Sequence, residues 1–231
     1  MFLYSLLSVS EQTTELIKWI SVVAVILLLA VIAFIGTSNK KEKYDAKKLA
    51  FAGICVSMSF TLSVLKFKIF ESGGSITFAS FVPILLFAYI YGAADGFLVG
   101  LIHGLLNFIE SPYILTPVTF LLDYLLPFAS VGVMGFFSDK KRSEKHVKPL
   151  IVGAVCVFSL RLIFHLLSGV IFFNAGYIAD NFPVWAIENS FLYSFIYQCM
   201  YVPFDALIAI GVLIALEKTK LLDNLLTQIR K

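Results

Sequence analysis

The sequence predicts an all-α integral membrane protein, and its composition is the first reason. Apolar residues make up 59% of the 231 residues and charged residues only 14%. Soluble domains average about 45–50% apolar and about 25% charged residues, so this chain cannot cover an ordinary water-facing surface. The formal net charge of +3 is small and apolar runs interrupt the basic residues, which argues against nucleic-acid binding.

The second reason is the length of the apolar runs, because a helix that spans a bilayer needs about 20 mostly apolar residues. Seven segments fit or approach this length: 16–35, 48–69, 78–91, 97–109, 118–137, 150–173 and 187–216. The first is too long for the core of a signal peptide and no convincing cleavage site follows it, so it reads as an uncleaved helix. The third and fourth are short, and we expect neighbouring helices to shield them in part from lipid.

The third reason is the distribution of Lys and Arg. Three clusters hold 14 of the 18 basic residues, at 40–48, 140–148 and 218–231. Basic residues accumulate on the cytoplasmic side, which places these clusters and the C-terminus there. The chain then divides into an extension with an extra transmembrane helix (1–44), a six-helix membrane domain (45–217) and a cytoplasmic amphipathic tail (218–231). The tail either lies on the inner membrane surface or extends the last span.

Three of the ionisable residues in the spans stand out: Asp123, Arg161 and His165. A charge at the centre of a span costs about 2.5–3.5 kcal/mol on insertion scales, so each is a candidate functional residue. Arg161 and His165 are four residues apart and share one helical face. Two interpretations stay open: an Asp123–Arg161 ion pair that only joins two helices, or a polar cluster that lines a cavity in the outer half of the bundle.

The last span is unusually polar where it begins. It carries Tyr193 and Gln198, and the Gln198 amide should find a hydrogen-bond partner because an unpaired amide in hydrocarbon is costly. Asp205, further along, is expected to contact a partner or water. Phe173 lies two turns beyond His165 and can face the same cavity. His103 stands alone on its span, which is more typical of a packed core histidine than of a ligand.

Several chemistries have no motif in the sequence. There is no GxxxxGK[ST] phosphate loop, no GxSxG or HExxH pattern and no Cys/His cluster. We therefore expect no enzyme activity, no catalytic residues, no metal and no cofactor, and no ATP hydrolysis by this chain. Small residues at Ala50, Gly53 and Ser57 make a smooth helix face, suited either to packing within the bundle or to docking of a partner.

Four local patterns occur in an order that resembles a known family. They are Gly73-Gly-Ser-Ile-Thr77 leading to Val82-Pro83-Ile84, Pro112-Tyr-Ile-Leu-Thr-Pro117 followed by Leu121-Leu-Asp-Tyr124, the run from Arg161 to Phe173, and Tyr193-Ser-Phe-Ile-Tyr-Gln198. Together they resemble the ThiT family, the thiamine-specific substrate-binding (S) components of energy-coupling factor (ECF) transporters. The resemblance covers roughly residues 48–216.

The resemblance implies a six-helix bundle that binds the vitamin near the outer face, under a loop between its first two helices. It implies these substrate-binding residues: His103, Tyr113, Asp123, Tyr124, His165, Phe173, Tyr193 and Gln198. Asp123 corresponds to a family carboxylate, usually Glu, that hydrogen-bonds the aminopyrimidine. His165 matches a histidine beside the thiazolium, and Phe173 replaces an aromatic, commonly Trp, that stacks on that ring.

The remaining positions follow the same resemblance. Tyr113 matches a loop tyrosine of the pocket, while Tyr193 and Gln198 fall where the family has Tyr and Asn near the hydroxyethyl end. Gly74 and His103 stand where the family has tryptophans, so the pocket differs in shape from that of its relatives. This difference leaves a related pyrimidine or another vitamin open as the ligand.

The implied partners are a membrane scaffold and two ATPase subunits, with Ala50, Gly53 and Ser57 at the position of the family's Ala-rich docking motif. Two other classes of function stay open at this point. One is a membrane structural or assembly protein without transport activity. The other is a self-sufficient secondary transporter, which the absence of an evident inverted repeat disfavours.

Overall fold

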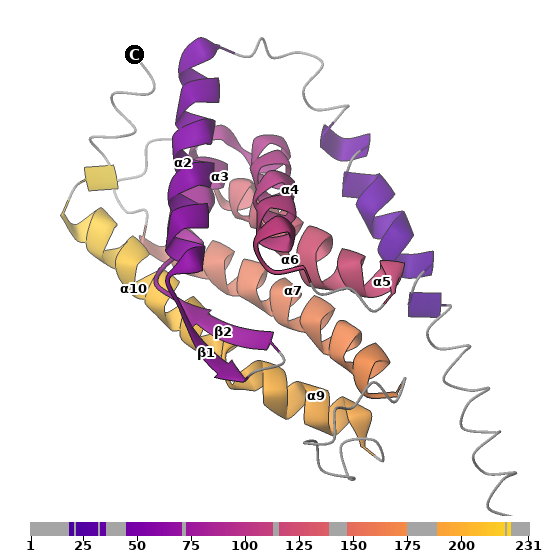
Figure 1. Cartoon of the computed structure of the whole chain (residues 1–231). Helices are drawn as coiled ribbons and strands as arrows, with labels where there is room; N and C mark the ends of the chain where they lie inside the picture. The colour runs from indigo at the N-terminus through magenta and orange to yellow at the C-terminus, as the bar shows by residue number, and fades with distance from the viewer. Residues whose placement is uncertain are drawn as a thin grey trace, which may run out of the picture.

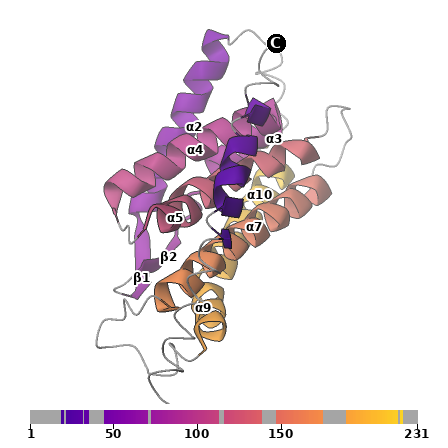
Figure 2. The same cartoon turned by 90° about the vertical axis from the view of Figure 1, so that its right-hand side faces the viewer.

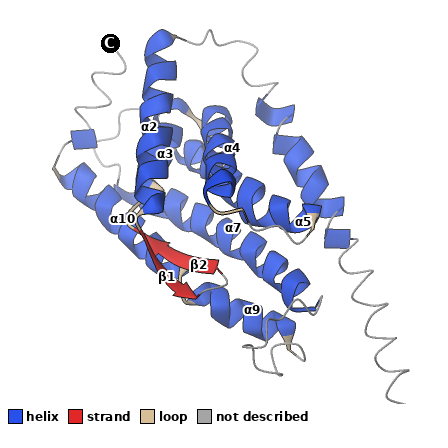
Figure 3. Ribbon diagram, viewed as in Figure 1, coloured by secondary structure: helices blue, strands red, loops and turns tan. Residues whose placement is uncertain are grey.

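The fold was analysed in a computed structural model that describes residues 19–20, 22–31, 33–35, 45–70, 73–112, 116–138, 147–174, 189–219 and 221–222. Figures 1 and 3 show a bundle of tilted helices with one β-hairpin on its side. The elements after the N-terminal helix (Val22–Ile35) are α2 (Ala46–Val64), β1 (Lys66–Phe70), β2 (Gly73–Thr77), α3 (Val82–Tyr91), α4 (Ala93–Glu110), α5 (Pro117–Phe120), η2 (Leu121–Leu125), α6 (Leu126–Ala129), η3 (Ser130–Phe137), α7 (Val147–Asn174), α9 (Ser190–Cys199) and α10 (Val202–Lys218).

Among the described residues, five helical stretches are long and apolar enough to cross a membrane. They are Ala46–Val64, Ala93–Glu110, Pro117–Phe137, Val147–Ile171 and Ser190–Lys218. The shorter α3 completes the six-helix core that the sequence predicts, and the N-terminal helix is the predicted addition. The membrane class, the helix order and the extra helix are therefore confirmed.

Helix α3 forms the centre of the main hydrophobic core. It has 10 residues, and every one from Val82 to Tyr89 is buried. Helices α2, α4, η3 and α10 pack around it, so protein rather than lipid covers this short segment. The expected shielding of the third apolar segment is thereby confirmed.

A stripe of glycines lets α4 lie very close to the stretch from Pro117 to Phe137. Gly96, Gly100 and Gly104 recur every four residues along one face of α4. A Cβ atom on Gly100 would collide with the carbonyl oxygen of Phe128, and one on Gly104 with the carbonyl oxygen of Tyr124. Small residues permit such backbone contact between helices in lipid. This contact sets the position of the η2 turn.

One ion pair joins α2 to α4, and a second joins β1 to the end of α4. Lys48 Nζ lies 2.6 Å from Asp95 Oδ2 near the start of both helices, and Lys66 Nζ lies 2.6 Å from Glu110 Oε2 just beyond the end of α2. The two helices therefore run parallel, as required when one short helix crosses back between them.

The hairpin differs from the sequence-based expectation of a helix over 48–69. Helix α2 ends at Val64, and β1 pairs with β2 in antiparallel register, Lys66 opposite Thr77. The run Lys66-Phe67-Lys68-Ile69 alternates polar and apolar residues with a period of two, which suits a strand and not a helix. Gly73 to Ser75 form the start of β2.

Replacing Gly100 by Ala should lower the free energy of unfolding by about 1–3 kcal/mol, because the added methyl meets a fixed backbone carbonyl that cannot turn away. The matched control is Gly53→Ala, since a Cβ at Gly53 meets nothing within 4 Å. Thermal unfolding in detergent measures both. Equal melting temperatures for the two variants would contradict the close α4 contact.

Candidate functional site

Asp123 lies on a widened helical turn that its own sequence explains. Residues Leu121–Leu125 form a π-helical turn in which the Leu126 N–H bonds the Leu121 carbonyl, five residues back. Pro127 has no N–H and its ring crowds the carbonyl of Asp123, four residues earlier, so an ordinary α-turn cannot form here. Single π-turns of this kind are frequent at functional sites.

The Asp123 carboxylate points at α7. Ser168 Oγ donates to Oδ2 at 2.6 Å, and His165 Nδ1 lies 3.2 Å from Oδ1. The Asp123 side chain keeps 29% of its surface exposed, whereas Ser168 and His165 are buried. Asp123 therefore lies at the accessible edge of a polar cluster whose other members are enclosed.

The hydrogen bonds around His165 define its protonation. Arg161 Nε donates to His165 Nε2 at 3.4 Å. A guanidinium can only donate, so Nε2 accepts and Nδ1 carries the ring proton. Nδ1–H then donates to Asp123. In this arrangement the imidazole is neutral.

Arg161 forms its ion pair with Asp205, not with Asp123. Its Nη1 lies 2.8 Å from Asp205 Oδ2, and both side chains are buried. The other carboxylate oxygen of Asp205 accepts from the Thr77 N–H at 2.8 Å and from the Thr77 hydroxyl at 3.2 Å. The Arg161 guanidinium also lies over the Phe81 ring, 4.4 Å from its centroid.

This pairing corrects the Asp123–Arg161 pair considered above, and it shows that the partner of Asp205 is Arg161. The cause is a break in the last span. Residues 200–201 separate α9 from α10, and Pro203 follows at once. The break changes the direction of the chain at the start of α10. The first turn of α10 therefore places Asp205 beside α7, level with Arg161.

The same break arranges Gln198 and Tyr201. Gln198 Nε2 donates to the His165 carbonyl at 3.1 Å, and the Tyr201 hydroxyl donates to Gln198 Oε1. The expected partner for the Gln198 amide is confirmed. The Tyr201 ring also meets the His165 ring edge-on, at 6.2 Å between centroids.

Three members of the cluster were missed by sequence reasoning: Thr77, Ser168 and Tyr201. Ser168 had a usable signal, because it follows His165 by three residues and so shares its helical face. Thr77 and Tyr201 had none, since their places depend on the unexpected hairpin and on the break before α10.

Other predicted site residues lie around the cluster. The Tyr124 hydroxyl donates to the Ser111 carbonyl at 2.6 Å, which ties the η2 turn to the end of α4. His103 is fully buried, and its ring meets the Phe128 ring edge-on at 5.1 Å between centroids. The same Phe128 ring lies beneath the Arg161 guanidinium, so Phe128 contacts both residues. Tyr193 is half-buried on α9.

Some predicted residues fall outside the described part of the chain. Tyr113 lies there, and so does the side chain of Phe173, whose backbone belongs to α7. The predicted docking residues Ala50, Gly53 and Ser57 are all exposed on α2.

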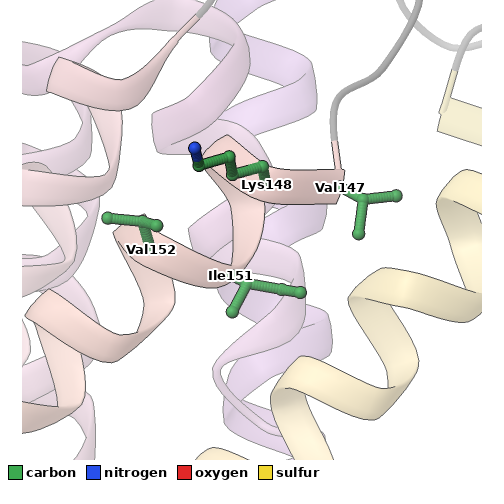
Figure 4. Close-up of a pocket in the computed structure, with 4 residues that line it drawn as sticks. All are labelled: Val147, Lys148, Ile151 and Val152. Carbon is green, nitrogen blue, oxygen red and sulfur yellow. The ribbon is translucent and has the colours of Figure 1, made fainter.

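An apolar pocket lies away from the polar cluster. It has a volume of about 300 Å³ and is lined by Val147, Lys148, Ile151 and Val152 at the start of α7 (Figure 4). Ile151 precedes His165 by fourteen residues, which is about 20 Å along a helix. This pocket therefore belongs to the opposite end of α7 from the Asp123 site.

The charges of the cluster do not cancel. Arg161 and Asp205 neutralise each other, and His165 is neutral, which leaves the Asp123 carboxylate as the uncompensated charge among these described residues. A half-exposed carboxylate at the edge of an apolar bundle attracts a cation that can also donate hydrogen bonds. The arrangement therefore suits the binding of such a ligand.

Comparison with known proteins gives a consistent result. Residues 49–223 match the family described as thiamine transporter protein (Thia_YuaJ). The thiamine transporter ThiT of Bacillus subtilis (strain 168) is 32% identical over 137 residues, which cover 56% of this chain and 67% of that protein. The solved structure of ThiT from Listeria monocytogenes shares the fold, with a TM-score of 0.63 and 24% identity over 74% of this chain and 93% of that one.

The matched region runs from the second turn of α2 to the end of α10 and contains every residue of the polar cluster, while the N-terminal helix precedes it. Because the match covers well over half of the chain, the predicted resemblance is confirmed. The chain belongs to the thiamine transporter protein family, and it is therefore a multi-pass membrane transport protein and not an enzyme.

Proposed function

We propose that this protein is the S component of an ECF-type vitamin importer, which captures thiamine at the outer face and delivers it through an ATP-driven partner module. The observation that carries the proposal is the uncompensated Asp123 carboxylate at the accessible edge of the buried cluster. The proposal extends family membership to a ligand site, a direction and a partner.

Thiamine complements this site chemically. It is a cation with a flat aminopyrimidine whose amino group donates hydrogen bonds. Each Asp123 oxygen accepts one bond within the protein and keeps a further lone-pair site for a ligand donor. Aromatic faces around the thiazolium would add roughly 0.5–2 kcal/mol each, and Tyr113, Phe173 and Tyr193 are the side chains we assign to that role.

The depth of the site supports capture from outside. His165 precedes the end of α7 at Asn174 by nine residues, or about 14 Å along the helix. The opposite ends of the helices carry Lys47, Lys48, Lys148 and Lys218. With basic residues on the cytoplasmic side, Asp123 lies in the outer half of the membrane and the C-terminus is cytoplasmic.

Two observations support a partner module that hydrolyses ATP: the sequence has no phosphate loop, and helix α2 exposes a face of small residues. Without a phosphate loop in this chain, ATP must be hydrolysed by another subunit. Helix α2 exposes Ala50, Gly53 and Ser57. Ion pairs to α4 from Lys48 near its start and from Lys66 just beyond its end hold this face in a fixed position. We assign the face to docking of a membrane scaffold with two ATPase subunits.

Asp123→Asn should weaken thiamine binding roughly 10- to 150-fold, the equivalent of one charge-assisted hydrogen bond of about 1.5–3 kcal/mol. Titration of the purified protein, followed by intrinsic fluorescence, measures the affinity. The matched control is Asp45→Asn, which removes an exposed carboxylate at the start of α2 and should change nothing.

The same titration separates ligands. Neutral hydroxymethylpyrimidine shares the aminopyrimidine but lacks the thiazolium charge, so it should bind more weakly than thiamine. Equal or tighter binding of the neutral compound would identify a related pyrimidine as the ligand. No saturable signal with thiamine would refute the thiamine site.

Asp205→Asn should destabilise the protein by about 3–5 kcal/mol, because it leaves the buried Arg161 charge unpaired. It should also weaken thiamine binding, since an uncompensated positive charge then lies behind Asp123. Adding Arg161→Met should recover part of the stability. Thermal unfolding and thiamine titration of both variants test this. If Asp205→Asn kept the wild-type melting temperature and affinity, Asp205 would not be the group that neutralises Arg161.

Vesicles that hold this protein alone should accumulate no thiamine, whereas co-reconstitution with the scaffold and both ATPases should give ATP-dependent uptake. Gly53→Trp should abolish uptake and leave thiamine affinity unchanged, because it obstructs only the exposed face of α2. Uptake by the protein alone would instead establish a secondary transporter.

A further inference from the structure

We propose that the N-terminal helix, which lies outside the matched family region, holds the Asp123 turn in its binding position. The inference rests on the proposed function, because it assigns a positioning role toward the same ligand site. Figure 1 shows this helix on the outside of the bundle next to α5, and Figure 2 shows it crossing beside α5 and α7.

The helix forms a small hydrophobic cluster with the residues that flank Asp123. Ala24, Leu122, Leu126 and Ile171 are all buried in this cluster, which is separate from the main core around α3. Leu122 immediately precedes Asp123, and Leu126 closes the π-turn by bonding Leu121. The helix therefore packs directly against the turn that aims the carboxylate.

The same cluster reaches the partners of Asp123 on α7. Phe164 and Leu167 pack against it, and they are the immediate neighbours of His165 and Ser168. The N-terminal helix thus contacts both η2 and α7, on the sides that face away from the Asp123 carboxylate.

The packing face of the N-terminal helix is well defined. Ile20, Ala24 and Leu28 recur every four residues and face the cluster. On the other side of the helix, Val23, Ile26 and Leu29 are more than half exposed. Ala24 is only 2% exposed, so a small side chain lets the helix approach closely here.

A second contact fixes the other end of the helix. The Phe34 ring meets Phe97 edge-on at 5.7 Å and lies 5.8 Å from the Phe136 ring. The helix is therefore attached to α4 and η3 near its end and to the Asp123 turn near its start.

The turn needs support because it lacks regular helical bonding. Pro127 removes one backbone donor, and the π-turn replaces α-helical bonding with wider bonding, such as the bond from the Leu126 N–H to the Leu121 carbonyl. Lipid chains could cover Leu122 and Leu126, but fluid chains do not fix a backbone position. A packed helix does so, because close-packed protein transmits small displacements.

The test inserts volume at the contact in the full-length protein. Ala24→Leu should weaken thiamine binding about tenfold by displacing the Asp123 turn. Val23→Leu is the control on the same helix, because Val23 is 53% exposed, and it should leave affinity unchanged. Adding Leu122→Ala to Ala24→Leu should restore most of the affinity by making room for the new side chain. Ala24→Val repeats the experiment with a smaller insertion if Ala24→Leu does not fold.

A double-mutant comparison separates positioning from plain stability. In an Asp123→Asn background Ala24→Leu should change thiamine affinity less than twofold, because the group that it displaces no longer carries the charge. The inference is overturned if Ala24→Leu lowers only the melting temperature, or if it weakens binding equally in both backgrounds. If the wild-type protein does not bind thiamine, both the proposed function and this inference are refuted.

Discussion

The buried charge of Arg161 is the constraint on which the rest of the site depends. A guanidinium in the middle of an apolar bundle must be paired and fully hydrogen-bonded. Asp205 supplies the counter-charge and uses its second oxygen to hold Thr77 at the end of the hairpin. The Arg161 Nε sets the tautomer of His165, which in turn donates to Asp123. One charge thereby fixes two helices, a hairpin and the protonation of a site residue.

Much of the architecture could be predicted because membrane insertion leaves strong traces in a sequence. Apolar length and basic clusters were sufficient for the helix order, the additional helix and the shielding of α3. The hairpin was missed because Lys66 to Phe70 continue an apolar stretch, and a length criterion does not register their alternation. Period, not hydropathy, separates the strand from the helix before it.

Some residues of the polar cluster were predictable, but their pairing was not. His165 and Gln198 stand out because polar side chains are rare within spans, and the structure places both in one cluster. The partner of Arg161 was missed because a sequence gives the depth of a residue but not the direction it faces. The break before α10 changes that direction, which brings Asp205 to Arg161. The glycine stripe of α4 is visible in the sequence as a four-residue spacing, but the sequence does not show which helix packs against it.

Helix α3 has a consequence for how the protein reaches the membrane. Its 10 residues span about 15 Å, half of a hydrocarbon core, and a single residue, Gly92, connects it to α4. A segment this short is a poor substrate for independent insertion. The tight link to α4 favours its entry as one arm of a helical hairpin, and in the folded bundle α2, η3 and α10 cover it. The most buried part of the bundle is therefore completed only when the last span, made long after α3, has been added.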